Sequence, residues 1–546
     1  MKKHFLLILI LLLAFILRVP FLDKYPAGLN ADEAAVGYNA YSLLQTGRDE
    51  HGTSWPLVFR SFDDYKPAGY FYLVLPFVAS LGLNVWAVRL PSALLGVLSV
   101  YFIYLLTNKL FSKSQIGHLA ALMLTISPWH IHFSRAGWEV NAASTFMVIG
   151  LYFLLKSLLN TKYFLLTTIF FVLSLYTYHS LRIIIPLVSL AFLLIYLPDI
   201  KSAFARPGQL KPVIISVIIG LLLLIPLILQ FASVEGRSRF SGVSVFADSG
   251  PYWEALEYRR DHSNIWINRS LHSRLITYSR RFVENYLSHF SPTFLFISGD
   301  EIGRSKTPEV GQLLFVTAPF LILGLCFLIG KNNKSAKLIL TWLFISPLAA
   351  ALTFQSPHAL RAQNMVYPLA IITALGLFKF LSFISSLNLK LLTTIYLLLI
   401  TMFGYNFSRY LHQYYVHYPK ELPYAWQYGF DQIGALAKSR YDSYDRIIIS
   451  DRYDQPYILL AFFSKYSPQT LQKEIKLTPR DKFGFSTVTN FGKYEFHRID
   501  WGKDSRTANA LIITADEKAP DDLAIGRILD PAGRTMYRIY DTNKLK

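Results

Sequence analysis

The sequence predicts a mainly α-helical, polytopic membrane protein, with about eleven spans and a small C-terminal α/β domain. Its 546 residues are 53% hydrophobic and only 16% charged, whereas soluble domains carry roughly 25% charged residues. Apolar stretches of about 18 or more residues, the length that a bilayer-spanning helix needs, recur along most of the chain. A single soluble core could not bury so many wholly apolar helices, so the pattern indicates a helical bundle in a membrane.

The expected spans lie at residues 5–22, 89–110, 116–133, 141–159, 162–180, 183–198, 212–232, 311–330, 337–353, 362–383 and 390–408. The basic start and the first apolar run imitate a secretory signal. Arg18, Pro20 and Asp23 follow in place of a cleavage site, so we expect a retained first span. The single cysteine, Cys326, lies inside an apolar run and is expected to pack as a small apolar residue.

Lysine and arginine in short loops mark the cytoplasmic side of a membrane protein. Lys2 and Lys3 begin the chain, and later basic clusters fall in every second loop, at 109–113, 156–162, 201–211 and 331–337. All of these loops can be cytoplasmic only if the apolar segment 67–83 does not cross the membrane. We therefore predict that this segment is interfacial or re-entrant, in a multi-pass plasma-membrane protein with a cytoplasmic N-terminus.

The same alternation of cytoplasmic and outer loops places three polar regions outside: 23–88, about 233–310, and the tail from about 409. We predict a transmembrane domain at 1–408, which includes the two outer loops, and an extracytoplasmic α/β domain at 409–546. Residues 31–46 predict a helix in the first loop. Strand-like runs lie at 446–450, 510–514 and 534–540, and the Pro-Ala-Gly turn at 531–533 predicts a hairpin.

The formal net charge of +19 is explained by the basic cytoplasmic loops. The sequence shows no helix-turn-helix, zinc finger or Gly/Arg-rich tract, so we expect the lipid bilayer, and no nucleic acid, as a partner.

The first outer loop holds the most informative polar residues. Asp32 and Glu33 are adjacent carboxylates near a membrane surface, which can hold a metal, act as a general base or cap a helix. Asn30 or Asp32 would suit the N-cap of the helix at 31–46. Lys66, two residues after Asp64, precedes the interfacial segment. An ammonium group there can attract a lipid phosphate, or it can simply snorkel to the interface.

Three further clusters of ionisable residues fall on the same predicted side of the membrane. Arg135 and Glu139 lie among aromatic residues and could line a sugar site, although an aromatic belt with a surface ion pair would look the same. The other two clusters contain His179 with Arg182 and His358 with Arg361. Ionisable groups that converge at one membrane face indicate a functional site.

The order of these motifs resembles the GT-C membrane glycosyltransferases of family 39, which include protein O-mannosyltransferases and the bacterial transferase that puts aminoarabinose on lipid A. The resemblance is carried by the acidic pair after the first span, the Lys-Pro segment at 66–67 and the run RLPSALLGVLSVYFIYLL at 89–106. The stretches 285–313 and 456–472 also look like bacterial members. Lys-Pro-Ala stands here where the family has Lys-Pro-Pro.

The resemblance implies inverting transfer of a sugar from a polyprenyl-phosphate donor, of the undecaprenyl or dolichyl type, to a protein, lipid or polysaccharide acceptor. Asp32 matches the expected general base, Glu33 its acidic neighbour, and Lys66 the lysine that meets the lipid phosphate. Glu139 stands near a second acidic position of the family. Some relatives use a divalent metal, for which Asp32, Glu33 and Glu139 could supply oxygen ligands.

The chemistry of that reaction suggests roles for the other candidates. A departing phosphate needs cations, and Lys66, Arg135, Arg182 and Arg361 are candidates for donor binding. Asp64, Glu139, His179 and His358 are candidates for a sugar or acceptor site. The alternative from another class is a transporter or flippase of lipid-linked or small substrates, which would place its broken helices and charges near the bilayer midplane. A structural membrane subunit is the third possibility. The sequence specifies neither the sugar nor the acceptor.

Overall fold

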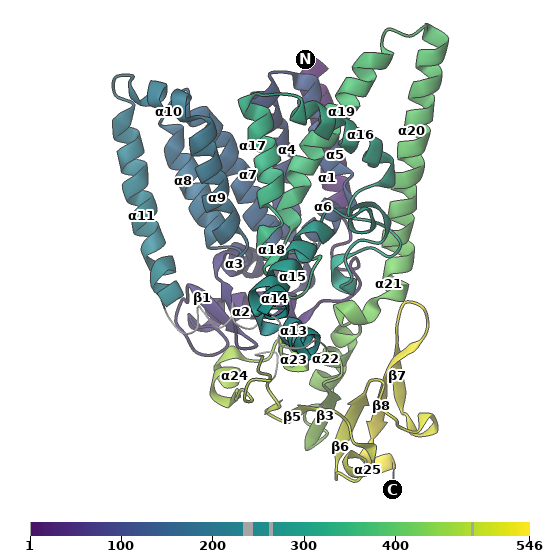
Figure 1. Cartoon of the computed structure of the whole chain (residues 1–546). Coiled ribbons are helices and arrows are strands. Elements are labelled where there is room, and N and C mark those ends of the chain that lie inside the picture. The colour runs from purple at the N-terminus through teal and green to yellow at the C-terminus, as the bar shows by residue number, and fades with distance from the viewer. Residues whose placement is uncertain (1, 233–243, 261–265, 482–484, 546) are drawn as a thin grey trace. The chain divides into compact units, whose positions relative to one another are not determined.

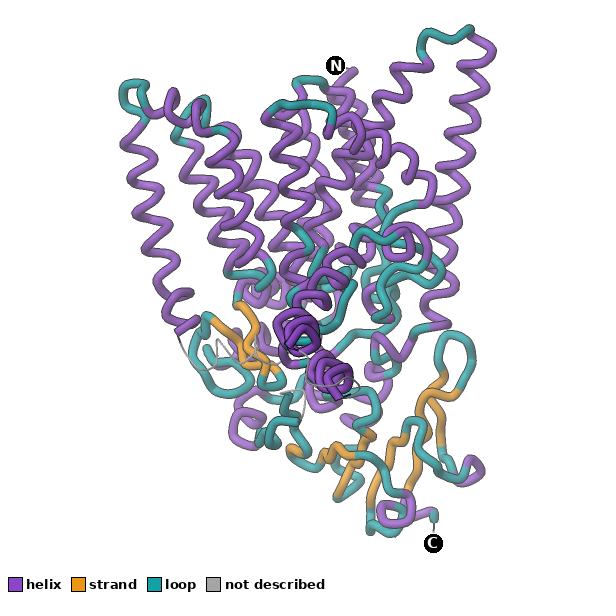
Figure 2. The backbone as a smooth tube through the Cα atoms, in the orientation of Figure 1, coloured by secondary structure: helices purple, strands orange, loops and turns teal. Residues whose placement is uncertain are grey.

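The computed structural model describes residues 2–232, 244–260, 266–481 and 485–545. Most of these residues are helical (Figure 1). Within the described ranges, strands occur only in a short hairpin of the first outer loop and in a sheet of the C-terminal segment (Figure 2). The predicted class, a helical bundle with a small C-terminal α/β region, is confirmed.

Six helices of the described part of the chain are long and apolar enough to cross a bilayer. They are α4 (Val85–Phe111), α7 (Glu139–Ser157), α11 (Leu210–Ala232), α17 (Lys334–Ile345) continued by α18 (Leu348–Ala351), α19 (Val366–Ile384) with its preceding turn, and α20 (Leu389–His412). A further pair, α9 (Leu181–Ile195) and α10 (Leu197–Phe204), is bent by 77°. Each coincides with a predicted span, so the multi-pass character of the chain is confirmed.

The other predicted spans correspond to shorter apolar helices: α1 (Lys2–Arg18), α5 (Ser114–Thr125), α6 (Pro128–Ser134), α8 (Tyr163–Leu175) and α16 (Ala318–Ile329). The span predicted at 116–133 is interrupted between α5 and α6. Pro128 explains the break, because proline has no backbone N–H to donate and disfavours helical geometry in the residue before it.

The ambiguous apolar segment at 67–83 forms helix α3 (Gly69–Leu81). Its 13 residues extend about 20 Å at ~1.5 Å per residue, which is short for a hydrocarbon core of ~30 Å. Its interfacial location, and the orientation of the whole bundle, stay predictions.

The chain forms two compact units. One comprises Met1–Arg18, Leu94–Ser134 and Glu139–Gln413, and so contains most of the apolar helices. The other comprises Val19–Ala93, Arg135–Trp138 and Tyr414–Lys546. The first outer loop thus belongs to the same unit as the C-terminal segment, and we call this second unit the polar unit. The domain boundary at 408/409 stays a prediction.

In the polar unit, the first outer loop folds into α2 (Ala31–Thr46), which matches the predicted helix, and the antiparallel strands β1 (Val58–Ser61) and β2 (Asp64–Pro67). The C-terminal segment contributes α21 (Tyr418–Glu421), α22 (Phe430–Ser439), α23 (Pro456–Ser464), α24 (Pro468–Glu474) and α25 (Trp501–Asp504). Buried alanines and glycine on α2 allow α3 and α23 to pack closely against it.

The C-terminal sheet has six strands in the order β4-β5-β3-β6-β8-β7. Its centre is β3 (Arg446–Ser450), which pairs in parallel with β5 (Tyr494–His497) and β6 (Ala510–Thr514). Antiparallel pairs add β4 (Asn490–Phe491), β8 (Thr535–Asp541) and β7 (Gly526–Leu529). The three predicted strands are β3, β6 and β8, and the predicted hairpin joins β7 to β8. Sequence patterns missed β4 and β5, which are short, and the hairpin prediction gave no bounds for β7.

The second outer loop, predicted at 233–310, contains α13 (Gly250–Arg260), α14 (Trp266–Leu271) and α15 (Arg274–Ser288). Its residues 233–243 and 261–265 lie outside the described residues.

Candidate active site

The N-terminus of α2 is fixed by a capping box. Asn30 is the N-cap, and its side-chain oxygen accepts a hydrogen bond of 3.1 Å from the backbone N–H of Glu33. The Glu33 carboxylate in turn accepts from the backbone N–H of Asn30 at 3.4 Å. This reciprocal pattern stabilises the first turn of a helix. Of the two predicted capping residues, Asn30 is therefore the cap, which leaves the Asp32 side chain for another role.

Glu33 is fully buried and forms a two-pronged ion pair with the fully buried Arg89 on α4. The Arg89 Nε and Nη2 atoms each lie 2.8 Å from a different carboxylate oxygen, and the Gly137 backbone N–H donates to Glu33 at 2.7 Å. Arg89 also donates to the carbonyls of Leu22 and Pro26, at 2.8 and 2.9 Å. The Glu33 oxygens are thus engaged, and the geometry favours a positioning role for this residue.

Asp32 forms an ion pair with Lys66 on β2. The Asp32 side chain is 26% exposed and the Lys66 side chain only 7%, so the carboxylate can be reached while the ammonium group is largely shielded from water. Lys66 also lies over the ring of Phe62, with Nζ 5.2 Å from its centroid. The two charges attract each other strongly because their site is partly desolvated. A substrate anion can replace Asp32 beside Lys66, and a substrate proton donor can replace Lys66 beside Asp32.

Asp64, a predicted sugar or acceptor residue, begins β2 and is partly exposed. Its neighbour Asp63 makes the prominent contacts, with Arg60 at 2.7 Å and with Arg480 of the C-terminal segment. Burial alone would raise the pKa of Asp63, but the hydrogen bonds from Arg480 and Arg60 outweigh it and lower that pKa. Sequence reasoning missed Asp63 because one of its two partners, Arg480, lies 417 residues away along the chain.

Sequence reasoning also missed another carboxyl group of the first loop, that of Glu50. It is fully buried, accepts from the Asn39 side chain at 3.1 Å, and lies 3.5 Å from the hydroxyl of Tyr457. Burial raises the pKa of Glu50 to about 8. Its neighbour His51 is affected in the opposite sense, since burial lowers the pKa of His51 to about 4. A Glu that follows a polar turn carries no sequence signal for such burial.

Arg135, a predicted donor-binding residue, is fully buried in the polar unit. Its Nη2 donates to the carbonyls of Pro20 and Tyr25, at 2.9 and 3.2 Å. The guanidinium also lies over the rings of Tyr414 and Tyr415, at 5.8 and 5.4 Å. This arrangement favours a role in fixing the segment that precedes α2, and phosphate binding by Arg135 stays a prediction.

The remaining candidates lie in the other compact unit. Glu139 opens α7 and is buried. The Arg182 guanidinium bonds to the carbonyl of Leu175 and to His179, at 3.1 and 3.0 Å. Arg361 donates to the Thr353 hydroxyl at 2.7 Å, and the ring of His358 lies 3.8 Å from Asp300. Their participation with Asp32 and Lys66 stays a prediction.

The predicted metal ligands do not present a ready coordination site. Glu33 is bound by Arg89 and Asp32 by Lys66, and across the described ranges no group of three or more His, Cys, Asp or Glu side chains is arranged to hold an ion.

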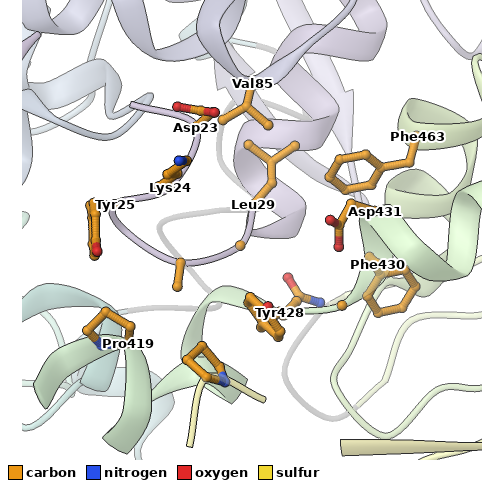
Figure 3. A pocket seen from close by; sticks show the side chains of 15 residues that line it. Asp23, Lys24, Tyr25, Leu29, Val85, Pro419, Tyr428, Phe430, Asp431 and Phe463 are labelled. Atoms are coloured by element: carbon orange, nitrogen blue, oxygen red, sulfur yellow. The ribbon is translucent and has the colours of Figure 1, made fainter. Parts of the chain in front are cut away.

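A cavity of about 400 Å³ lies in the polar unit, beside the segment that leads into α2 (Figure 3). Asp23, Lys24 and Tyr25 line it from that segment, and Tyr428 and Asp431 from the C-terminal segment. Gln427, which also lines it, accepts a hydrogen bond from the backbone N–H of Ala31 at 2.7 Å. Asp32 and Lys66 are not among the lining residues, so this cavity is separate from the carboxylate–lysine pair.

Comparison with known proteins found one family model and several solved structures to which this chain is similar. Residues 66–229 match the family model described as dolichyl-phosphate-mannose-protein mannosyltransferase. The structure is similar to ArnT from Cupriavidus metallidurans bound to undecaprenyl phosphate, with 11% identity, 99% of this chain and 97% of that chain covered, and a TM-score of 0.56. The apo state of ArnT gives 12% identity, coverage of 99% and 98%, and the same TM-score of 0.56.

The archaeal oligosaccharyltransferase AglB from Archaeoglobus fulgidus, in complex with an inhibitory peptide and a dolichol-phosphate, is a weaker match. Its TM-score is 0.49 at 11% identity, with 84% of this chain and 64% of that chain covered. A comparison with curated proteins found no match. The chain has the GT-C membrane glycosyltransferase fold, which confirms the resemblance first seen in the order of its motifs.

Proposed function

We propose that this protein is an inverting glycosyltransferase that moves a sugar from a polyprenyl-phosphate donor to an acceptor at the extracytoplasmic face of the plasma membrane. The observation that carries the proposal is the ion pair between Asp32, at the N-terminus of α2, and the shielded Lys66 on β2. The match to a mannosyltransferase family model and the likeness to a protein that binds undecaprenyl phosphate support the choice of donor.

Lys66 receives the donor phosphate. Cleavage of the bond between the anomeric carbon and the phosphate oxygen leaves a lipid phosphate with additional negative charge. An ammonium group stabilises that charge most strongly where water is scarce, and the Lys66 side chain is only 7% exposed. In the resting protein, Asp32 occupies the position of the phosphate as its anionic substitute.

Asp32 acts as the general base. It accepts the proton of an acceptor hydroxyl or amine while the acceptor oxygen or nitrogen forms its bond to the anomeric carbon. Inversion requires the base and the leaving phosphate to lie on opposite faces of that carbon. The sugar therefore has to come between Asp32 and Lys66, so donor binding separates the resting ion pair and frees both groups for catalysis.

Glu33 is a positioning residue in this scheme. Its ion pair with Arg89 and its part in the capping box fix the first turn of α2, and the adjacent Asp32 is thereby held in place. The acceptor, which is a protein, lipid or polysaccharide, and the identity of the sugar are left to experiment.

The proposal is tested by incubating the purified protein with a panel of polyprenyl-phosphate sugars and candidate acceptors. We expect one donor to be consumed with release of the polyprenyl phosphate, and a product whose anomeric configuration, read by NMR, is opposite to that of the donor. Retention of configuration, or movement of an intact lipid-linked sugar across a vesicle membrane without cleavage, would contradict it.

A further inference from the structure

We infer that the C-terminal segment is part of the catalytic unit, because it holds both the helix that carries Asp32 and the hairpin that carries Lys66. Gln427, Arg480 and Ser486 are the positioning residues. The inference rests on the proposed function. In it, the C-terminal segment positions the two catalytic side chains, a role that differs from selecting the acceptor.

The first anchor is the Gln427 side chain, which is buried against the N-terminus of α2. Its Oε1 atom accepts a hydrogen bond of 2.7 Å from the backbone N–H of Ala31. Its Nε2 atom donates to the carbonyl of Tyr453 and, at 2.6 Å, to the carbonyl of Asp454. The first N–H groups of a helix lack partners within that helix. Gln427 therefore completes the first turn of α2, one residue before Asp32.

Only a neutral amide can make all of these contacts. The oxygen faces an N–H donor and the nitrogen faces two carbonyl acceptors, so a carboxylate at this position would oppose the carbonyls of Tyr453 and Asp454. Gln427→Glu is therefore a sharp test, since the two side chains have nearly the same shape but glutamate is charged and has no N–H to donate.

The second anchor acts on the turn between β1 and β2. Ser61 pairs with Asp64, so Phe62 and Asp63 form a two-residue turn, and their φ angles are +57° and +62°. Positive φ at both central residues suits the twist of a hairpin but is unfavourable for a bulky residue such as Phe. The local sequence therefore does not hold this turn by itself.

Contacts from the C-terminal segment stabilise the turn. The Ser486 backbone N–H donates to the carbonyl of Phe62 at 3.1 Å, and Arg480 binds the carboxylate of Asp63. The ring of Tyr457 packs edge-on against Phe62, with centroids 6.0 Å apart. Because Phe62 also lies under the Lys66 ammonium group, a displaced turn would displace Lys66.

The inference is tested by steady-state kinetics on full-length variants, with donor and acceptor varied separately. Arg480→Gln is expected to raise the donor KM about 10-fold and to leave the acceptor KM within about 2-fold, and Arg480→Lys should restore part of the difference. Gln427→Glu is expected to lower kcat more than it changes either KM, since it disturbs the turn that holds the base. Arg452→Gln is the matched control: Arg452, like Arg480, pairs with an aspartate, but its partner Asp516 lies within the C-terminal segment and not in the first loop. The Arg452 side chain is 44% exposed, against 43% for Arg480.

Hydrogen exchange gives a second readout that does not depend on turnover. Amides of the β1–β2 hairpin in Arg480→Gln, and the Ala31 amide in Gln427→Glu, should exchange about 10-fold faster than in the wild type. Suppose that exchange is faster at these places in the variants but the wild type transfers no sugar. The proposed function would then be refuted, whereas the structural contacts of Gln427 and Arg480 would be confirmed. A change in acceptor KM alone, or unchanged kinetics and unchanged exchange, would overturn the inference.

Discussion

The buried Glu50 makes a quantitative prediction about stability and pH. Burial raises the pKa of Glu50 to about 8, from 4.5 for an exposed glutamate. The folded protein then keeps the Glu50 proton between about pH 4.5 and 8 while the unfolded chain releases it. Stability that is fully present below pH 4.5 is therefore lost as the pH rises through 8.

The size of the loss follows from the difference between the pKa of Glu50 in the folded protein, about 8, and 4.5 in the unfolded chain. At about 1.4 kcal/mol per unit, the full difference approaches 5 kcal/mol, and about 4 kcal/mol of it falls between roughly pH 5 and 9. Glu50→Gln removes the titration but keeps an oxygen that accepts from Asn39 and places an amide beside the Tyr457 hydroxyl. The variant should therefore gain stability relative to the wild type as the pH rises.

The assay is unfolding of the detergent-solubilised protein across this pH range, for the wild type, Glu50→Gln and the control Glu257→Gln. Glu257 is exposed on α13, so Glu257→Gln controls for the exchange of a glutamate for a glutamine at a site without burial. A stability difference between Glu50→Gln and the wild type that does not change with pH, or that falls as the pH rises, would refute the reasoning.

Three further predictions concern the site itself. Glu33→Gln should lower the free energy of unfolding by about 3–5 kcal/mol, because it leaves Arg89 without its buried counter-charge, and equal stability in a thermal unfolding assay would argue against the positioning role. Lys66→Ala should raise the donor KM by ~10–100-fold with a much smaller effect on the acceptor KM, and equal effects on both would count against a phosphate role. Removal of divalent metals by a chelator should leave turnover within about 2-fold, since the buried Arg89 engages both oxygens of Glu33 and no group of three or more His, Cys, Asp or Glu side chains among the described residues is arranged to hold an ion, whereas loss of activity that Mg²⁺ or Mn²⁺ restores would show that a metal is needed.

The features that the sequence predicts are the local ones. The apolar runs indicate the helices of the bundle because length and hydrophobicity decide membrane insertion. The capping signal at Asn30 and the small residues after it define α2 with the bounds 31–46. The β-branched runs at 446–450 and 510–514 predict the strands of the sheet centre. In each case the deciding interactions lie within one segment of chain.

The features that the sequence does not predict depend on distant partners. The Glu33–Arg89 pair joins residues 56 positions apart, and Asp63–Arg480 joins residues 417 positions apart. From the sequence, Glu33 is a catalytic candidate because it matches the acidic neighbour in the family resemblance, and Arg135 is a donor-binding candidate because a departing phosphate needs cations. Burial against carbonyl groups and counter-ions, which only the fold reveals, favours positioning roles for both.

The central claim is that Asp32 takes the acceptor proton while Lys66 stabilises the departing lipid phosphate. The most direct test is single-turnover sugar transfer by Asp32→Asn, measured together with its binding of the polyprenyl-phosphate donor. We expect the variant to fold and to bind the donor while the rate of transfer falls by at least ~100-fold. Transfer at the wild-type rate by Asp32→Asn would show that Asp32 is not the general base.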